Sequence, residues 1–263
     1  MSGKRRKRKF KAGDAESGYD KGSVRLVLAG VLHCLWTLRR RGREQKQVPM
    51  LTVYGDLDSG NVYKVRLLLA QLGIAYRRVD TTQNRGEPAT AEFRAINPIG
   101  KIPTIVFDDG RMLSESGAIL YLLARDTALF PGEAWDQANV LRWMFFEQYS
   151  HEPYIAVNRH WKLHLPLAEQ SRLADRITQN HARGEHALAI MEQRLSSSTW
   201  LAAGRYTIAD IALYAYTHTA ADGGFDLAPH PSIRAWLDRV RAQPGHIPQM
   251  QEERGVPVVK WPG

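Results

Sequence analysis

Two short stretches of this sequence could together bind the two ends of a small peptide. In the first, Ile102 precedes Pro103 at the start of a predicted strand, and a proline there removes a ladder donor and can take the cis form. An extended peptide could then pair with the outward-facing N–H and C=O of Ile102. In the second, Glu115 and Ser116 open a predicted helix, whose free amides and dipole favour a carboxylate. Because Glu115 can meet an amine, this stretch suits the zwitterionic end of an amino acid.

The same stretches also have an interpretation that needs no ligand. Residues 97–105 could form only a cis-proline turn, and residues 114–119 only the capped start of a helix. Whether the two stretches lie close together in space therefore depends on the strands and helices predicted around them.

The residues that follow position 50 predict a strand, a helix and a second strand. Leu51–Tyr54 has strand character, and apolar side chains recur at helical spacing from Val62 to Leu72, with Gly73 as a C-cap. Ile74–Val79 can form the next strand. Because a helix connects the two strands, we expect them to be parallel.

A hairpin and another helix complete this half of the chain. Ile102–Phe107 and Arg111–Leu113 flank Asp108-Asp109-Gly110, which is a turn signal. A helix is predicted from about Glu115 to Arg125. The order of these elements favours a small mixed sheet with helices packed on it.

Beyond Pro131-Gly132 the pattern becomes helical, without strand runs. Thr207 and Asp210 have the spacing of a capping box, and Tyr206 can pack against Ile211 as a hydrophobic staple. The apolar stretch 208–216 behind this cap predicts a buried helix in an all-helical second domain.

The combination of these motifs strongly resembles the cytosolic glutathione S-transferases. It rests on Gly-Lys-Ile-Pro at 100–103, Ser-Glu-Ser-Gly-Ala-Ile at 114–119 and the Thr207/Asp210 cap, and it covers residues 50–245. The resemblance implies an α/β thioredoxin-like N-terminal domain plus an all-α C-terminal helical domain, with glutathione as co-substrate. It also implies a cytoplasmic homodimer. The glutathione-binding residues that it implies are Lys101, Ile102, Pro103, Glu115 and Ser116.

Within this family the catalytic group lies at the end of the first strand or the start of the first helix, where Tyr54, Ser59 and Asn61 are candidates. Ser59-Gly60-Asn61 looks like the bacterial nu-type and fungal prion-related branch, whose Thr/Ser-x-Asn pattern faces the glutathione sulfur. Lowering a thiol pKa by roughly two units takes about 2.7 kcal/mol, which one charge-assisted hydrogen bond and a helix terminus can supply. Tyr54 remains an alternative because tyrosine-type transferases carry their hydroxyl on that strand. Ser59 could also serve as an N-cap.

Aromatic side chains around Pro153 suggest a pocket for a planar electrophile. Pro153 should kink or interrupt a long helix. The alternative is that these aromatic residues form the core of a helical bundle. The residues assigned to the pocket are Tyr149, Tyr154, Asn158 and Trp161.

The single cysteine, Cys34, excludes an intrachain disulfide, a thiolate metal cage and a Cys-x-x-Cys redox pair. Since no cysteine follows it, a catalytic cysteine of the omega type is also excluded, and any disulfide reduction must use the sulfur of glutathione. His160 and His164 could share a metal ion at i, i+4, but no third ligand is suggested nearby, so we expect no metal.

The formal charge of +9 comes from the N-terminus. Residues 1–49 contain 14 Lys or Arg and 4 Asp or Glu, a net of +10, whereas residues 50–263 contain 22 and 23, a net of −1. The body of the protein therefore offers no basic face, and we expect no nucleic-acid partner. No apolar run reaches the roughly 18 residues of a bilayer span, so we expect no membrane partner. Residues 1–49 lack globular patterning, and we expect a disordered leader or translation from Met50. The intact mass of the protein from its native host tests this.

These observations predict five segments: a basic leader (1–49), a thioredoxin-like domain (50–127), a linker (128–136), a helical domain (137–250) and a tail (251–263). The predicted function is a glutathione S-transferase that stabilises the glutathione thiolate and transfers it to an electrophile. A glutathione-dependent disulfide-bond reductase is one alternative. A non-catalytic binding or regulatory protein with the same fold is the other.

Overall fold

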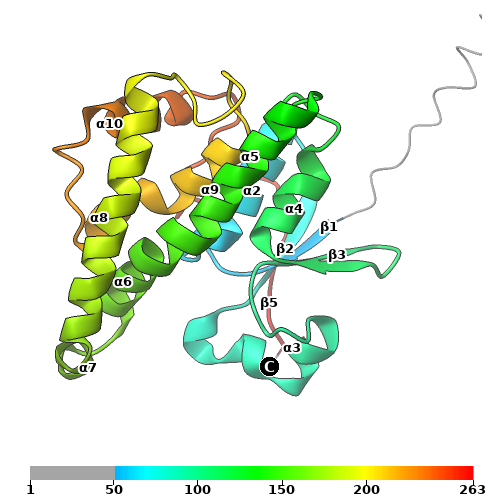
Figure 1. The fold of residues 1–263 in the computed structure, drawn as a ribbon. Helices are drawn as coiled ribbons and strands as arrows, with labels where there is room; N and C mark the ends of the chain where they lie inside the picture. Colours follow the sequence, from blue (N-terminus) through cyan, green and yellow to red (C-terminus); the bar gives the residue numbers. More distant parts are fainter. Residues whose placement is uncertain (1–50, 263) are drawn as a thin grey trace, which may run out of the picture. The chain divides into compact units, whose positions relative to one another are not determined.

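The computed structural model describes residues 51–262. The predictions for the leader and for Met50 lie outside the described residues. Within them, a small sheet with its helices is followed by a set of longer helices (Figure 1). No helix in this range combines the length and apolar character that crossing a membrane requires.

The sheet has the mixed topology that the sequence predicts. Its strand order is β4-β3-β1-β2-β5. β1 pairs parallel with β2 across the α2 crossover and antiparallel with β3, which forms a hairpin with β4. The strands are β1 (Leu51–Tyr54), β2 (Tyr76–Asp80), β3 (Thr104–Phe107), β4 (Met112–Ser114) and β5 (Val258–Lys260).

A fifth strand, β5, lies within residues 251–263, the segment that the sequence analysis describes as a tail. β5 pairs parallel with β2 and covers what would otherwise be an open sheet edge. Just before it, the Glu253 carboxylate accepts hydrogen bonds from buried Arg66 and from Tyr76. After it, the Trp261 ring packs edge-on against Phe93. The C-terminal segment is therefore part of the sheet domain.

The helices follow the predicted order. Ser59 caps the helix that connects β1 to β2, and Gly73 ends it in the left-handed conformation, with φ of 64°. The first helix of the second domain begins at Ala134, inside the predicted linker. The helices are α2 (Gly60–Leu72), α3 (Ala91–Ile96), α4 (Ser116–Ala124), α5 (Ala134–Phe146), α6 (Glu152–His164), α7 (Leu167–Arg172), α8 (Ala174–Ser196), α9 (Ile208–Thr217) and α10 (Pro231–Arg241).

The long helix that Pro153 was expected to interrupt is broken just before that residue. A π-helical turn, η3 (Glu147–His151), separates α5 from α6. Such turns inside helices are rare and re-aim the side chains around them. Short 3-10 turns lie at η1 (Gln83–Arg85), η2 (Glu87–Ala89) and η4 (Ala220–Gly223).

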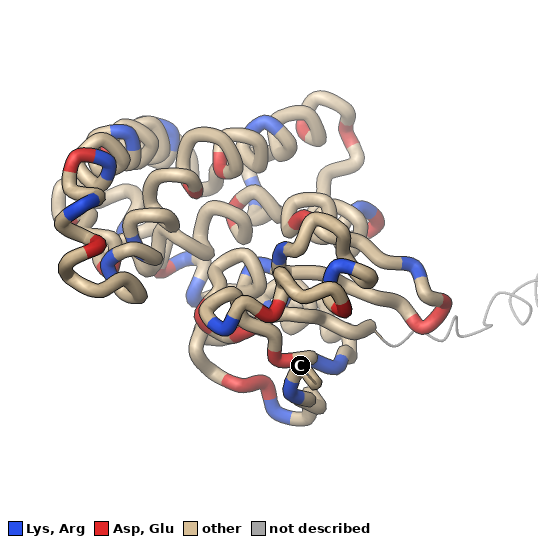
Figure 2. The backbone as a smooth tube through the Cα atoms, turned by 90° about the horizontal axis from the view of Figure 1, so that it is seen from below, with Lys and Arg blue, Asp and Glu red and all other residues tan. Residues whose placement is uncertain are grey.

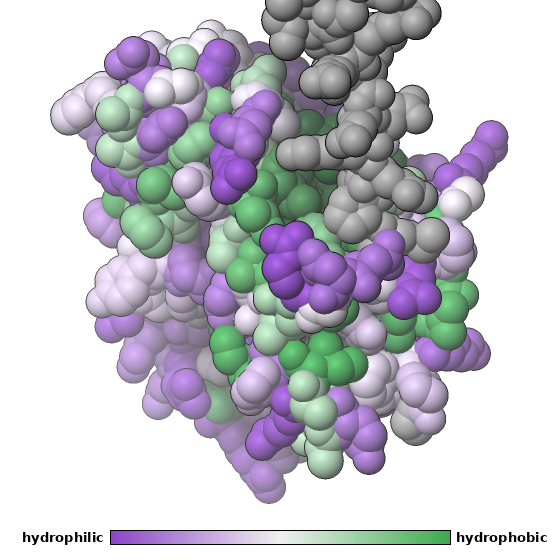
Figure 3. Space-filling view, turned by 90° about the vertical axis from the view of Figure 1, so that its right-hand side faces the viewer, coloured by the Kyte–Doolittle hydropathy of each residue, from purple (hydrophilic) through white to green (hydrophobic). Residues whose placement is uncertain are grey.

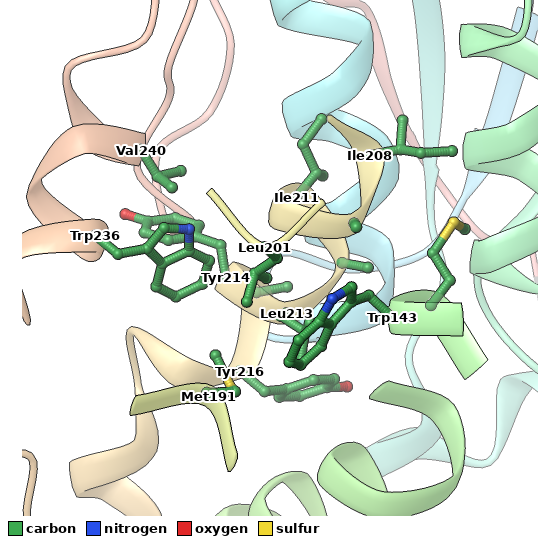
Figure 4. Packing of buried hydrophobic residues seen from close by; sticks show 14 of the residues in the cluster. Trp143, Met191, Leu201, Ile208, Ile211, Leu213, Tyr214, Tyr216, Trp236 and Val240 are labelled. Carbon is green, nitrogen blue, oxygen red and sulfur yellow. The ribbon is translucent and has the colours of Figure 1, made fainter. Parts of the chain in front are cut away.

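The core is centred on α9, every residue of which is buried. The predicted capping box is present, and the Asp210 carboxylate also accepts hydrogen bonds from the Leu201 amide and the Trp236 indole. Figure 4 shows Trp143 of α5 and Trp236 of α10 packed next to this helix, and Trp236 contacts the ring of Tyr214 in α9 edge-on. The same apolar cluster includes Leu67 and Leu68 of α2, so α2 of the sheet domain contributes to the core of the helical domain.

Candidate active site between the two domains

A cavity of about 460 Å³ lies between the sheet domain and the helical domain. Its walls come from the loop before α2, the turn before β3, the start of α4, and helices α6 and α9. It brings together eight of the residues that the sequence assigns to a site: Ser59, Asn61, Lys101, Ile102, Pro103, Glu115, Ser116 and Trp161. The two stretches expected to bind a peptide therefore do meet.

The turn before β3 lines this cavity with Lys101, Ile102 and Pro103. The Ile102–Pro103 peptide bond is cis, the form that the sequence analysis considered. Asn97 fixes the turn, because its buried side-chain amide donates to the Lys101 carbonyl and to the Thr104 hydroxyl, both at 2.9 Å. An extended ligand could pair with the exposed edge of this turn.

Opposite this turn, α4 begins at the cavity wall. Ser116 is its first residue, and Glu115 caps it with φ of 68°, a value uncommon for residues other than glycine. The free amides and the positive end of the helix dipole lie here together with the Ser116 hydroxyl. A carboxylate can bind at this point, and the Glu115 carboxylate on the same wall can meet an amine.

The Thr/Ser-x-Asn pattern occupies the start of α2. The Ser59 hydroxyl accepts a hydrogen bond from the Val62 amide at 3.3 Å, so its own hydrogen is free to donate. Gly60 permits close packing here, because a Cβ at this position would lie 2.4 Å from the Tyr216 ring. Ser59 and Asn61 are both partly exposed on the cavity wall.

Asn61 is held by three other elements of the protein. Its backbone amide donates to the Tyr216 hydroxyl of α9 at 3.2 Å. Its side-chain oxygen accepts hydrogen bonds from Lys64 Nζ at 2.7 Å and from Ser116 Oγ at 3.2 Å. Its side-chain nitrogen lies 3.4 Å from Glu152 Oε1 of α6. The nitrogen therefore has only one long contact and remains available to a ligand.

Behind Asn61 lies a buried ion pair that the sequence analysis missed. Lys64 Nζ is 2.7 Å from Glu147 Oε1, and the two residues are 1% and 2% exposed. Burial raises the pKa of Glu147 to about 7, against the lowering effect of the Lys64 charge. The sequence signal that could have indicated the pair is a charged residue on the otherwise apolar face of each helix.

The other side of the cavity is largely polar. Arg159 NH2 and His164 Nε2 lie 2.9 and 2.7 Å from the two carboxylate oxygens of Asp58. Although burial opposes the shift, these partners hold the pKa of Asp58 below its usual value. The rings of His160 and His164 lie 4.9 Å apart, and no group of three or more His, Cys, Asp or Glu in residues 51–262 is arranged to hold a metal.

Four sequence-assigned residues are not on the cavity wall. Tyr54 packs against the rings of Phe93 and Trp261. Asn158 is buried and donates to the Ile177 carbonyl, while Tyr149 is 82% exposed. Tyr154 contacts Arg183 instead. The residue types in the sequence do not show which side chains will face the cavity, because that depends on how β1, η3 and α6 pack.

Comparison with known proteins agrees with this arrangement. The family model described as "Glutathione S-transferase, N-terminal domain" matches residues 46–125, and "Glutathione S-transferase, C-terminal domain" matches residues 155–244. The chain belongs to the glutathione S-transferase family. The resemblance inferred from the sequence, including its fold, is confirmed.

Relatives in this family lie in the branch that the Ser-x-Asn pattern indicated. The chain is 31% identical over 191 residues to the disulfide-bond oxidoreductase YfcG of Escherichia coli, covering 70% of this chain and 87% of the relative. It is 25% identical to the protein URE2 of Meyerozyma guilliermondii, covering 74% and 78%. A glutathione S-transferase structure from Pseudomonas fluorescens superposes with a TM-score of 0.74 at 46% identity, covering 77% of this chain and all of that one.

Proposed function

We propose that this protein is a glutathione transferase that binds glutathione in the cavity, stabilises its thiolate and transfers it to an electrophile. One observation carries the proposal. The hydroxyl of Ser59 and the amide of Asn61, at the N-terminus of α2, share a cavity with the Ile102 backbone and with Ser116 at the start of α4.

The γ-glutamyl end and the cysteinyl backbone of the tripeptide each have a matching wall. The γ-glutamyl end meets the α4 backbone amides through its carboxylate. Its amine meets Glu115 and the oxygen of Ser116, whose own hydrogen is donated to Asn61 Oδ1. The cysteinyl backbone pairs with Ile102 as a short added strand. The sulfur then lies toward α2, loses its proton to solvent, and the thiolate accepts hydrogen bonds from Ser59 and Asn61. The thiolate attacks an electrophilic carbon and forms a thioether, while a leaving group departs with its bonding pair or, at an activated double bond, the displaced π pair takes up a proton from solvent.

A second candidate function is the reduction of disulfides. The polar outer wall favours it, because a planar aromatic electrophile gains little there, whereas a peptide-like mixed disulfide can form hydrogen bonds. Similarity to the oxidoreductase YfcG supports the same candidate. That wall includes Asp56, Asp58, Gln83, Asn84, Gln148, Glu152, Arg159 and His164.

We also propose a homodimer. Large apolar side chains stay exposed on α4, α5 and η3, among them Tyr121, Trp135, Phe145 and Tyr149. Figure 3, which faces the side of Figure 1 that carries α4 and the β3–β4 hairpin, shows hydrophobic residues between hydrophilic margins. Such a patch marks a contact surface. Figure 2 shows Lys and Arg interspersed with Asp and Glu along the backbone of both domains in this view.

Calorimetry of glutathione binding at neutral pH, in two buffers of different ionisation enthalpy, tests the proposal. Binding with proton release is expected, because the site should hold the thiolate. Binding without proton release would favour the non-catalytic alternative. Absence of binding would refute both enzymatic candidates. Turnover is then measured with a chlorinated nitroaromatic compound and, separately, with a glutathione mixed disulfide. Preference for the first compound indicates a transferase, and preference for the second indicates a reductase.

A further inference from the structure

We infer that Lys64 is a positioning residue that orients the Asn61 side chain so that its NH₂ group, and not its oxygen, faces the glutathione sulfur. The inference rests on the proposed function, because it concerns the thiolate site. Lys64 itself does not line the cavity and acts only through Asn61.

Either the oxygen or the nitrogen of the Asn61 side-chain amide could point toward Lys64. The oxygen and nitrogen of an asparagine amide are assigned from their hydrogen-bond partners. An ammonium group has donors and no acceptor, so the atom that lies 2.7 Å from Lys64 Nζ must be the oxygen. Ser116 Oγ donates to the same oxygen at 3.2 Å, which supports the same orientation.

The nitrogen of the Asn61 amide consequently points away from Lys64. With the oxygen held from behind, the NH₂ group is directed toward the cavity side, where its protein contact is Glu152 Oε1 at 3.4 Å. A thiolate in the cavity would find a hydrogen-bond donor there. A flipped amide would instead turn its oxygen toward the thiolate, and the partial negative charge of this oxygen would repel the thiolate. The orientation of the Asn61 amide therefore decides whether it attracts or repels the thiolate.

The position of the Lys64 charge also favours a thiolate in the cavity. Lys64 follows Asn61 by three residues on α2, on the same side of the helix, and its ammonium lies 5.4 Å from the Tyr216 ring centroid. Because it is 1% exposed, water screens its charge poorly, and the charge favours an anion nearby. Glu147 balances it from η3 at 2.7 Å.

Other titratable groups also surround this site. Glu152 of α6 and Tyr216 of α9 contact Asn61 directly. His151 of η3 is buried, and burial together with the Lys64 charge lowers its pKa to about 3, so it stays neutral at working pH. Lys64 is therefore the cation that contacts Asn61 among the described residues, and Glu147 and Glu152 are the nearby acids.

The test compares three variants of the full chain, which change Lys64 alone, Lys64 together with Glu147, or Glu147 alone. Lys64→Met removes the donor behind Asn61. Lys64→Met with Glu147→Met removes both charges and leaves an apolar pair, a replacement that buried ion pairs often tolerate without loss of stability. Glu147→Gln is the matched control, because a glutamine oxygen can still accept from Lys64 while the Lys64–Asn61 contact remains.

The measurement is the pKa of the bound glutathione thiol, from the ultraviolet absorbance of the thiolate across pH. Binding of S-methylglutathione, which has no thiol proton, is measured in parallel. Both variants that lack Lys64 should raise the bound thiol pKa by about one unit, a roughly tenfold smaller thiolate fraction at pH values below it. Binding of S-methylglutathione should stay within about threefold. Glu147→Gln should leave the thiol pKa low.

Two results would overturn the inference while the proposed function stands. One is an unchanged thiol pKa in the double Met variant. The other is an equal rise in Glu147→Gln and Lys64→Met, which is what a purely structural ion pair predicts. If the wild-type protein itself binds glutathione without an acid shift of the thiol, the proposed function fails, and the inference fails with it.

Discussion

The side-chain amide of Gln249 donates a 2.7 Å hydrogen bond to the main-chain carbonyl of Asp58, which precedes it by 191 residues. Gln249 is 5% exposed and belongs to the segment after α10. Asp58 immediately precedes Ser59, so the C-terminal segment holds the loop that carries a proposed sulfur ligand. Arg66, buried in α2, fixes the same segment by donating to the Gln249 carbonyl at 2.6 Å.

Replacing Gln249 with Leu should lower kcat/KM for glutathione by about threefold to tenfold, since a hydrogen bond of this kind contributes roughly 0.5–1.5 kcal/mol. Steady-state kinetics measure the loss, and thermal unfolding gives the accompanying change in stability. Gln251→Leu is the control, because Gln251 is exposed and accepts from Arg66 through its main-chain carbonyl, which the substitution keeps. Identical kinetics in both variants would remove the loop-holding role.

Replacing Ser59 and Asn61 together with Ala should lower kcat by about 100-fold, because two donors to the thiolate are lost, while the ends of glutathione stay bound. Tyr54→Phe is the control and should keep the wild-type rate, since Tyr54 packs against Phe93 and Trp261 away from the cavity. Loss of activity in Tyr54→Phe, with retention in the double variant, would transfer the role to the tyrosine.

Glu115→Gln and Ser116→Ala should raise KM for glutathione about fivefold to tenfold, because each removes one polar partner of the γ-glutamyl end. Ser116 also contacts the Asn61 oxygen, so its variant should lower kcat in addition, whereas the Glu115 variant should not. Initial rates over a range of glutathione concentration separate the two effects. An unchanged KM in both variants would exclude this end of the cavity as the binding point.

Asp210→Ala should destabilise the protein by about 3 kcal/mol, because it leaves the buried Leu201 amide, the Thr207 amide and the Trp236 indole without their acceptor. Urea unfolding measures this change. Asp238→Ala is the matched control, since that carboxylate is 73% exposed, and it should change stability by less than about 0.5 kcal/mol. Equal effects would mean that the capping network adds little.

His151 should make the protein less stable in acid. Burial lowers its pKa from 6.5 to about 3, so between these values the unfolded chain binds a proton that the native protein does not. The stability that His151 contributes is complete above about pH 6.5 and is lost as the pH falls, by up to about 1.4 kcal/mol per unit.

Comparison with His151→Gln isolates this effect, because Gln can still donate to Thr217, which lies 2.9 Å from His151 Nε2. Glu147 and Asp210, whose pKa values burial raises to about 7 and about 6, take up protons in both proteins. The difference in free energy of unfolding between wild type and variant should therefore shrink from pH 7 to pH 5. A constant difference over that range would contradict the assignment.

The sequence alone determined the elements and much of the site. Spacing predicted the parallel pair β1 and β2, the hairpin and the Thr207/Asp210 cap, because these are local patterns or short connections. Short motifs likewise predicted the residues from Lys101 to Pro103 and the start of α4. Each motif carries its own backbone geometry, so its place on the cavity wall could be expected before the fold was known.

Only the tertiary structure decided the contacts between distant segments. β5 joins the sheet because a short apolar run after residue 255 meets an open edge, and no local pattern states which edge it will meet. The pairing of Lys64 with Glu147, and the turning of Tyr149 and Asn158 away from the cavity, depend on how α2, η3 and α6 pack. The periodicity of a sequence predicts which side chains share one face of a helix. Which neighbouring element that face contacts is decided only when the helices pack together.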